Sequence, residues 1–399
     1  MNLLEGKNIL VCVSGSIAIY KNLELIRLFV KSGANVKVLM SEGAKRFITP
    51  LTFEAISGQK VLHKKSESWS DEYNHIKITK NVDLVVLAPA SANTINKFSC
   101  GIADTLLTQT LLANKKPLLL APSMNTNMYI DPSTQKSLKK LKKRGIKIVE
   151  PVFKKLACLD EGNGALADVW DIFYFASRIC LRDDFWKNKK VLVTGGGTRE
   201  RIDDVRFIGN FSSGKMAYNL ALSLFLRGAK VRLLTSKPKN APFKVVQFDD
   251  TKTLDLMMKK FSKKSDYLFM AAAVSDYKPK VFTKGKLKKK DMGKEWSLDL
   301  IQNEDILSKI DKKNLKVIGF KAEFDKQNAL INAKNMLENK NLDAVCLNIL
   351  GGDVNFSSEV SRMSFITKDD IKEIGLKSKL EVAFDIVDFS KKLGKDIKI

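Results

Sequence analysis

The sequence predicts an α/β protein of two consecutive domains, each with a mostly parallel sheet covered by helices. Short apolar runs such as residues 8–13 alternate with segments of helical period such as residues 20–32. Strands that are apolar along their whole length are typical of parallel sheets buried on both faces. A fresh apolar run over residues 190–194 ends in three glycines near the middle of the chain. Because 399 residues are ample for two domains, we expect a second sheet to begin there.

The first half predicts five strands, with ligand-type residues after several of them. The strands are expected at residues 8–13, 36–40, 82–87, 117–121 and 146–149. Ligands of such sheets bind beyond the carboxyl ends of the strands. Gly15, Ser16 and Ile17 suit a phosphate at a helix N-terminus, although a tight turn capped by Ser16 explains them equally well. The polar residues of 88–97 and 121–128 either bind a ligand or make turns and caps.

The second half predicts the same alternation. The glycines at 195–197 precede a polar loop with three arginines, an amide and two hydroxyls, and a helix from about residue 216. Further strands are expected at 230–235 and 267–273. Asp276 follows the latter, and its place at a strand end favours ligand binding over helix capping. The lysine-rich segment 284–290 is either a solvated strand edge or a clamp for anions.

Composition excludes some classes of protein and leaves others open. The net charge of +25 comes from lysine runs that are scattered and lack interleaved aromatics. This pattern favours a solvated basic surface over a nucleic-acid interface, and it suits anionic substrates. No apolar run is long enough for a membrane helix. Five cysteines without a CxxC pair argue against a structural zinc and suit a reducing, cytoplasmic setting.

Two sets of motifs carry a resemblance to a known family. The loop at residues 199–215 resembles the ligase half of the bifunctional phosphopantothenoylcysteine decarboxylase / phosphopantothenate–cysteine ligases of coenzyme A biosynthesis. Residues 88–97 and 121–128 resemble the paired signatures of flavodoxin-like, FMN-dependent cysteine decarboxylases. The resemblance covers nearly the whole chain. It implies a flavodoxin-like flavoprotein domain over residues 1–188 and a Rossmann-like ligase domain over residues 189–399, joined through a linker at 182–188.

The resemblance implies roles for residues of the first domain. FMN is needed because decarboxylation of an acyl-cysteine requires an electron sink. By resemblance His75 serves decarboxylation, Asn125 binds the substrate carboxylate, Met128 contacts substrate and Cys158 supplies the late proton. The flap around Cys158 departs from the family at Leu159 and Ala165. The residues expected to bind FMN are Gly15, Ser16, Ile17, Ser41, Ser91, Asn93 and Thr94.

In the second domain the resemblance implies activation of 4′-phosphopantothenate by CTP, followed by attack of cysteine. By resemblance Asn210 acts on the acyl-cytidylate and Arg206 contacts substrate, while Lys286 is catalytic and binds CTP. Mg²⁺ is expected with the triphosphate. Residues 302–305 replace a family Lys-Asn-Pro-Asp pattern, and Ala217 replaces a frequent glycine. The other residues expected to bind CTP are Ala271, Ala272, Asp276, Phe320, Lys334 and Lys340.

The family implies small-molecule partners and a homo-oligomer, with trimers through the flavin domain and dimers through the ligase domain. Neither a membrane nor a nucleic acid is expected as a partner. Two other functions stay open from the residues alone. One is a flavin- or nucleotide-dependent oxidoreductase, although no GxGxxG follows either opening strand. The other is a basic nucleic-acid-binding protein, which would bind DNA in a salt-sensitive way.

Overall fold

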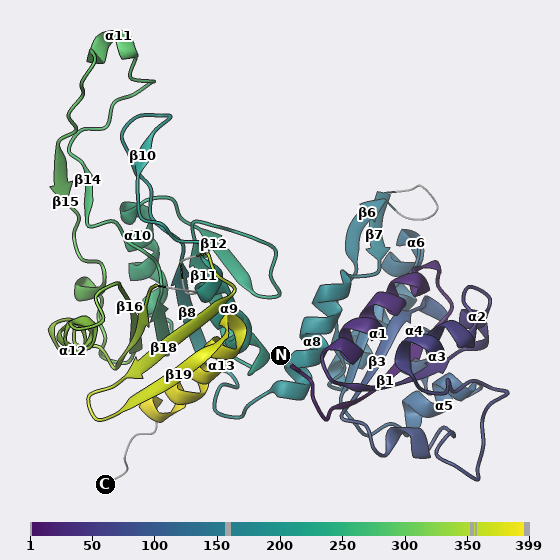
Figure 1. The fold of residues 1–399 in the computed structure, drawn as a ribbon. Coiled ribbons are helices and arrows are strands. Elements are labelled where there is room, and N and C mark those ends of the chain that lie inside the picture. Colours follow the sequence, from purple (N-terminus) through teal and green to yellow (C-terminus); the bar gives the residue numbers. More distant parts are fainter. Residues whose placement is uncertain (1, 156–160, 352–354, 356, 395–399) are drawn as a thin grey trace. The chain divides into compact units, whose positions relative to one another are not determined.

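The structure is a computed structural model that describes residues 2–155, 161–351, 355 and 357–394. The chain divides into two compact units, Met1–Leu181 and Arg182–Ile399 (Figure 1). Each unit has its own sheet and its own hydrophobic core.

The first unit contains a five-stranded, all-parallel sheet in the order β2-β1-β3-β4-β5. Neighbouring residues of a strand enter different cores, so Val11 packs with one face and Cys12 with the other. This two-sided burial explains why the strands read as continuous apolar runs. The strands are β1 (Asn8–Val13), β2 (Asn35–Met40), β3 (Leu84–Ala90), β4 (Leu118–Pro122) and β5 (Lys147–Ile148).

Helices cover both faces of this sheet. On one face lie α1 (Lys21–Lys31), α3 (Pro50–Ser57) and α8 (Val169–Leu181), and on the other lie α4 (Ala92–Cys100), α5 (Leu106–Ala113) and α7 (Pro132–Lys143). Shorter helical elements are α2 (Glu42–Lys45), α6 (Thr126–Ile130), η1 (Ile17–Tyr20) and η2 (Lys77–Thr79). An antiparallel hairpin of β6 (Val152–Lys155) and β7 (Glu161–Ala165) projects beside α6 (Figure 1).

The second unit contains an eight-stranded sheet in the order β12-β11-β8-β13-β16-β17-β18-β19. The strands from β12 to β17 are parallel, whereas β18 and β19 are antiparallel to their neighbours. The strands are β8 (Lys190–Gly195), β11 (Lys230–Thr235), β12 (Lys244–Gln247), β13 (Tyr267–Met270), β16 (Lys316–Glu323), β17 (Ala344–Ile349), β18 (Val360–Ile366) and β19 (Ile371–Ser378).

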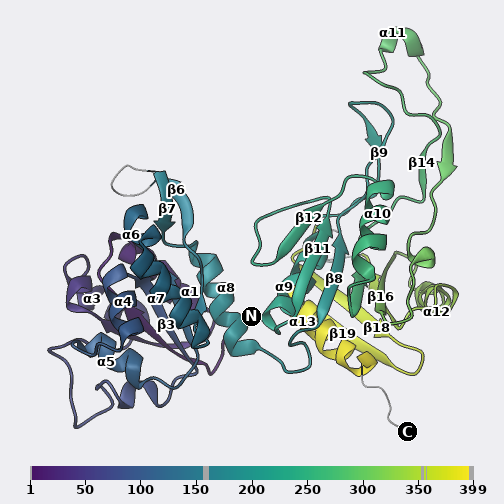
Figure 2. The same cartoon turned by 180° about the vertical axis from the view of Figure 1, so that it is seen from behind.

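One face of this sheet packs against α10 (Thr251–Ser262) and α12 (Ala329–Asn339), together with η3 (Leu307–Lys309). The helices α9 (Lys215–Leu226) and α13 (Lys379–Ser390) pack against each other, and η4 (Lys391–Gly394) follows α13 (Figures 1 and 2). Two short ribbons lie outside the sheet, β9 (Glu200–Arg201) with β10 (Phe207–Ile208) and β14 (Tyr277–Pro279) with β15 (Leu300–Gln302). The chain between β14 and β15 carries α11 (Lys289–Met292) far from the sheet (Figure 2).

The segment 182–188, which the sequence suggested as a linker, packs within the second unit. Trp186 is fully buried, and its ring centroid lies 4.9 Å from that of Tyr267. The Asp183 carboxylate receives a hydrogen bond from the Lys391 ammonium. The aromatic contacts therefore fasten the start of this unit to β13.

The α/β fold with mostly parallel sheets is confirmed. Two features were not anticipated, the antiparallel strands β18 and β19 at the sheet edge and the short ribbons outside it. Strand ends also shifted: β5 is only Lys147–Ile148, and β3 extends to Ala90. The strand expected at 267–273 ends at Met270 as β13, so the carboxyl ends of the motif-bearing strands move by up to three residues while the strand order along the chain stays as predicted.

Candidate functional sites

A pocket of about 810 Å³, here called the N-unit pocket, lies at the carboxyl edge of the first sheet. Its walls come from the segments after β1, β2, β3 and β4 and from the β6–β7 hairpin. Every residue expected to bind FMN lines it, and so do Asn125 and Met128. Those residues are Gly15, Ser16, Ile17, Ser41, Ser91, Asn93 and Thr94.

The hydroxyls of this pocket also cap helices, so the capping interpretation holds as well. The Oγ atoms of Ser16, Ser41 and Ser91 each accept a hydrogen bond from a backbone N–H two or three residues later. Asn125 caps α6 in the same way, at 2.8 Å from the Asn127 nitrogen. A hydroxyl oxygen that caps a helix has a second lone pair, and the hydroxyl keeps its own proton to donate. Capping therefore fixes the serine side chains at the pocket edge without using up their hydrogen-bonding capacity.

Two lysines that the sequence analysis did not single out also line the N-unit pocket. Lys21 opens α1, and its ammonium group is close enough to that of Lys154 on the β6–β7 hairpin for the two charges to interact unfavourably. Burial first, and then the adjacent Lys154, lower the pKa of Lys21 to about 8. Two neighbouring ammonium groups repel each other unless an anion lies between them. The pair is therefore suited to a phosphate or a carboxylate.

Two residues that we expected to act in decarboxylation, Cys158 and His75, are not among the described residues that line the N-unit pocket. Cys158 lies in 156–160, outside the described residues. His75 does not line the pocket. Its Nδ1 lies 2.9 Å from Oε1 of Glu67, and its ring meets Trp69 edge-on with centroids 5.5 Å apart. The carboxylate thus fixes the orientation of the imidazole on the loop before η2.

A second pocket of about 520 Å³, here called the C-unit pocket, lies at the carboxyl edge of the second sheet. The glycines after β8 make it possible: a methyl group on Gly197 would collide with the carbonyl oxygen of Asn210. Asn210 in turn donates a hydrogen bond from Nδ2 to the Val274 carbonyl at 3.0 Å. Of the expected residues, Asn210, Ala271, Ala272, Asp276, Phe320 and Lys340 line this pocket.

Three expected residues, Arg206, Lys286 and Lys334, do not line the C-unit pocket. Arg206 pairs with the buried Asp203 at 3.3 Å and donates to the Leu287 carbonyl at 3.2 Å. These contacts hold Arg206 beside the lysine-rich segment that contains Lys286. Lys286 and Lys334 are exposed.

The pocket also contains residues that the sequence analysis missed, among them Lys215, Ser361 and Lys379. Lys379 is the first residue of α13, after the N-cap Ser378. A lysine at this position is unfavourable next to the positive helix end, and that signal was available in the sequence. Ser361 gave no signal, because only the pairing of β18 places it at the pocket.

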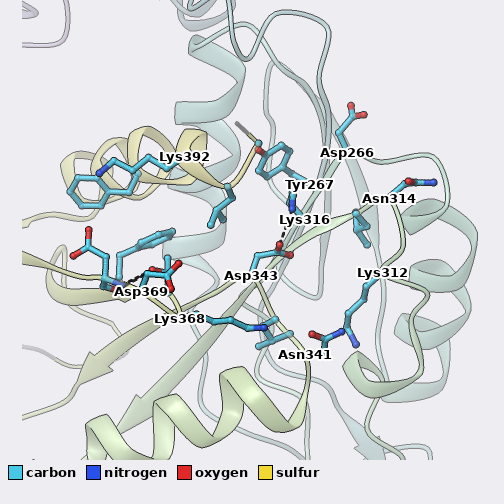
Figure 3. A pocket seen from close by; sticks show the side chains of 18 of the residues that line it. Asp266, Tyr267, Lys312, Asn314, Lys316, Asn341, Asp343, Lys368, Asp369 and Lys392 are labelled. Carbon is cyan, nitrogen blue, oxygen red and sulfur yellow. Dashed lines mark hydrogen bonds and ion pairs between the residues drawn. The ribbon is translucent and has the colours of Figure 1, made fainter. Parts of the chain in front are cut away.

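A third cleft, of about 720 Å³, lies at the opposite edge of the second sheet, where its parallel strands begin (Figure 3). Several lysines and aspartates line this cleft, and some of them form ion pairs with each other. Lys316 lies 3.2 Å from Asp343 and Lys372 lies 3.1 Å from Asp370. None of the residues expected from the sequence lines this cleft.

The described residues hold no group of three or more His, Cys, Asp or Glu side chains placed to bind a metal. Among the helices that the structure describes, none has the length and apolar character needed to span a membrane.

Comparison with known proteins assigns a family to both halves. Residues 2–180 match the family described as Flavoprotein, and residues 186–393 match the DNA/pantothenate metabolism flavoprotein C-terminal domain. The chain is 37% identical over 396 residues to the coenzyme A biosynthesis bifunctional protein CoaBC of Haemophilus influenzae, covering 96% of this chain and 97% of that protein. It is 36% identical over 398 residues to the protein of the same name from Bacillus subtilis, and the match covers 96% of this chain and 97% of that protein.

Solved structures match each half separately. A mutant PPC decarboxylase complexed with pantothenoylaminoethenethiol is 33% identical over 42% of this chain and 95% of that one, with a TM-score of 0.39. The C-terminal domain of a coenzyme A biosynthesis bifunctional protein CoaBC is 28% identical to this chain. The match covers 54% of this chain and 100% of that one, with a TM-score of 0.45. Since the two CoaBC relatives match along nearly their whole length and both family domains are present in order, the chain belongs to the family of bifunctional decarboxylase–ligase proteins of coenzyme A biosynthesis.

Proposed function

We propose that the second unit condenses 4′-phosphopantothenate with cysteine at the expense of CTP, and that the first unit decarboxylates the product to 4′-phosphopantetheine. The observation that carries the proposal is the pair of pockets at the carboxyl edges of two separate sheets. Each contains most of the residues expected there from the family resemblance. Two pockets on one chain suit two successive reactions on one substrate.

In the N-unit pocket we propose FMN as the cofactor. Serine hydroxyls at helix starts and the Lys21–Lys154 pair fit an anionic, phosphate-bearing group. Bound FMN would supply the electron sink that loss of CO2 requires. Asn125 binds the substrate carboxylate with the amide that its capping interaction holds in place. Cys158 donates a proton to the product carbon.

We propose that His75 acts in the N-unit pocket of a neighbouring copy of the chain. The residue is held by Glu67 outside its own pocket, whereas the family resemblance makes it catalytic. In the trimer expected for the flavin domain, a histidine outside its own pocket could still be catalytic, because it could enter the pocket of the neighbouring copy. Exposed apolar residues on this unit, including Trp69 at 63% and Ile76 at 43%, are available for such an interface.

In the C-unit pocket Asn210 is proposed to orient the acyl-cytidylate for attack by the cysteine amine. Its amide is positioned by the Val274 carbonyl, and Asp276 and Phe320 line the same pocket, as expected for residues that bind the nucleotide. Arg206, Lys286 and Lys334 are proposed to reach the reaction from outside this pocket, through the dimer or through closure of the lysine-rich segment. Mg²⁺ would enter with the triphosphate, since Mg²⁺ is usually bound through substrate phosphates. Free cysteines on both units support a cytoplasmic location.

The two-step ligase reaction can be tested without cysteine. With 4′-phosphopantothenate and radiolabelled CTP, the wild type should release pyrophosphate and hold an acyl-cytidylate. Asn210→Asp should accumulate this intermediate even when cysteine is added, because the attack is impaired. Rapid quenching and chromatography measure the label. If Asn210→Asp consumed the intermediate at the wild-type rate, the role of Asn210 would be wrong.

The same assay decides the role of Lys286. If Lys286 stabilises charge during activation, Lys286→Gln should slow formation of the cytidylate on the order of 10²–10³-fold. The exposed Lys284 of the same segment is the matched control, and Lys284→Gln should be close to wild type. Equal rates for both variants would assign Lys286 to the solvated surface.

A further inference from the structure

One wall of the C-unit pocket is formed by residues to which the family resemblance gave no role. Asn348 of β17, Ser361 of β18 and Lys379 of α13 line it. Ser361 is fully buried and Lys379 is only 6% exposed. The Ser361 Oγ and the Asn348 Oδ1 are buried without a hydrogen-bond partner among the described residues. Because buried polar atoms are nearly always hydrogen-bonded, these two oxygens point to a ligand in the pocket.

The backbone of β18 is irregular at this wall. The pairing of β18 with β19 shifts register between Ser361 and Met363. Such bulges often re-aim a side chain beside an active site. Here the shift accompanies a buried serine and a buried methionine that both line the pocket.

Lys379 contradicts the local preferences of its helix. It occupies the first position of α13, where the helix dipole disfavours a cation. Burial, and then the charge of Lys215, lower the pKa of Lys379, and the charge of Glu359 opposes them. The start of α13 is already stabilised by a capping box between Ser378 and Glu381. A local conflict of this kind is expected at functional sites.

The start of α9 adds further positive potential to the same pocket. Ser212, Ser213, Gly214 and Lys215 line it, and Gly214 is the N-cap of this 12-residue helix, with a φ of 71° and no side chain to cap it. The Lys215 N–H lies 3.5 Å from the Ser213 Oγ, which is long for a hydrogen bond. The Lys215 ammonium contacts Glu359 and the Ser357 carbonyl. The Lys215 ammonium is therefore partly neutralised. Two helix starts and the Lys379 ammonium still meet at the pocket, which suits a multiply charged anion.

Other lysines of the pocket are less suited to this anion. Lys340 pairs with Asp305 at 2.6 Å and Lys321 with Glu323 at 3.2 Å. Both ammonium groups are therefore already partly neutralised. Lys286 and Lys334 lie outside the pocket lining.

We propose that Lys379 and Ser361, together with the start of α9, bind the β- and γ-phosphates of the nucleotide. The proposal rests on the proposed ligase reaction. During activation a carboxylate oxygen of the acid bonds to the α-phosphorus, and the bond from this phosphorus to the β-bridging oxygen breaks. The departing pyrophosphate takes the electron pair and the negative charge. Lys379 stabilises that charge, so it is a catalytic residue of the activation step.

The test compares ligands with and without the β- and γ-phosphates on the full chain. Calorimetry measures the binding of CTP, pyrophosphate and CMP to the wild type, Lys379→Gln, Lys379→Arg and Ser361→Ala. Lys379→Gln should weaken CTP and pyrophosphate on the order of 10- to 100-fold, as expected for the loss of one charged hydrogen bond. CMP should change by less than about twofold, and Lys379→Arg should recover most of the loss. Ser361→Ala should weaken pyrophosphate by roughly 3- to 10-fold.

The matched control is Lys377→Gln, two residues away on β19, where the lysine pairs with Asp385 at 2.8 Å. It should bind all three ligands like the wild type. An equal loss of CTP and CMP in Lys379→Gln would contradict the proposal, and so would unchanged pyrophosphate binding. If Lys379→Gln does not fold, Ser361→Ala decides by the same comparison: pyrophosphate binding that stays at the wild-type level would contradict the proposal. If the wild type formed no acyl-cytidylate, the proposed ligase reaction itself would be wrong. That result is distinct from an equal loss of CTP and CMP binding in Lys379→Gln, which would contradict only the role of Lys379.

Discussion

At the scale of single residues, most of the candidate site was predictable because the motifs follow buried strands. Ser91 comes directly after β3 and Asn125 three residues after the end of β4, and parallel strands bring such ends to one edge of the sheet. Lys21 was missed because it looks like an ordinary exposed helical lysine, and Lys379 was missed although a lysine at the start of a helix is unfavourable. Their environments depend on Lys154 and Lys215, which are distant in sequence.

The lowered pKa of Lys21 predicts how cofactor affinity changes with pH. The ammonium form attracts the FMN phosphate, and the pKa of Lys21 is about 8 without an anion. Raising the pH from about 7 to about 9.5 should therefore remove the charge and weaken FMN binding by roughly tenfold. Quenching of flavin fluorescence measures the affinity. Lys21→Gln should bind weakly at neutral pH and show little further fall.

The exposed Lys31, at the other end of α1, is the control. Lys31→Gln should keep the wild-type pH dependence. A wild-type affinity that stays constant over this pH range would contradict the role of Lys21.

At the scale of elements, the helices and strands followed from period and burial, but their ends and partners did not. The segment 182–188 is rich in charge, which favours a linker, yet Trp186 is buried against Tyr267. One buried aromatic side chain can hold a charged segment against a domain, because it buries far more apolar surface than the charged side chains beside it. Similarly, β18 and β19 pair antiparallel at the sheet edge, and no local pattern specifies which strands become neighbours.

The packing of Trp186 predicts a large loss of stability when it is truncated. Trp186→Ala should lower the free energy of unfolding of the second unit by about 3–5 kcal/mol, because it leaves a cavity beside Phe185 and Tyr267. Denaturant unfolding of the full chain, followed by circular dichroism and by flavin release, separates this transition from that of the first unit. Trp296, which is 43% exposed, gives the control, and Trp296→Ala should cost under about 1 kcal/mol. A second-unit transition at the wild-type midpoint would show that segment 182–188 is a linker after all.

At the scale of the whole molecule, the chain joins two α/β units that each place a pocket at the carboxyl edge of a sheet. The pockets share no residue, so a change in one should leave the chemistry of the other intact. This independence distinguishes two enzymes on one chain from a single composite site.

The most direct measurement follows both products by mass spectrometry, with 4′-phosphopantothenate, cysteine and CTP given to the FMN-loaded full chain. Asn125→Asp keeps an oxygen that can cap α6 but places a charge against the substrate carboxylate, so it should accumulate 4′-phosphopantothenoylcysteine. Asn210→Asp should form little of this compound, yet should decarboxylate it when it is supplied. The wild type should deliver 4′-phosphopantetheine. Loss of both reactions in either variant, with the fold retained, would show that the two pockets do not act independently.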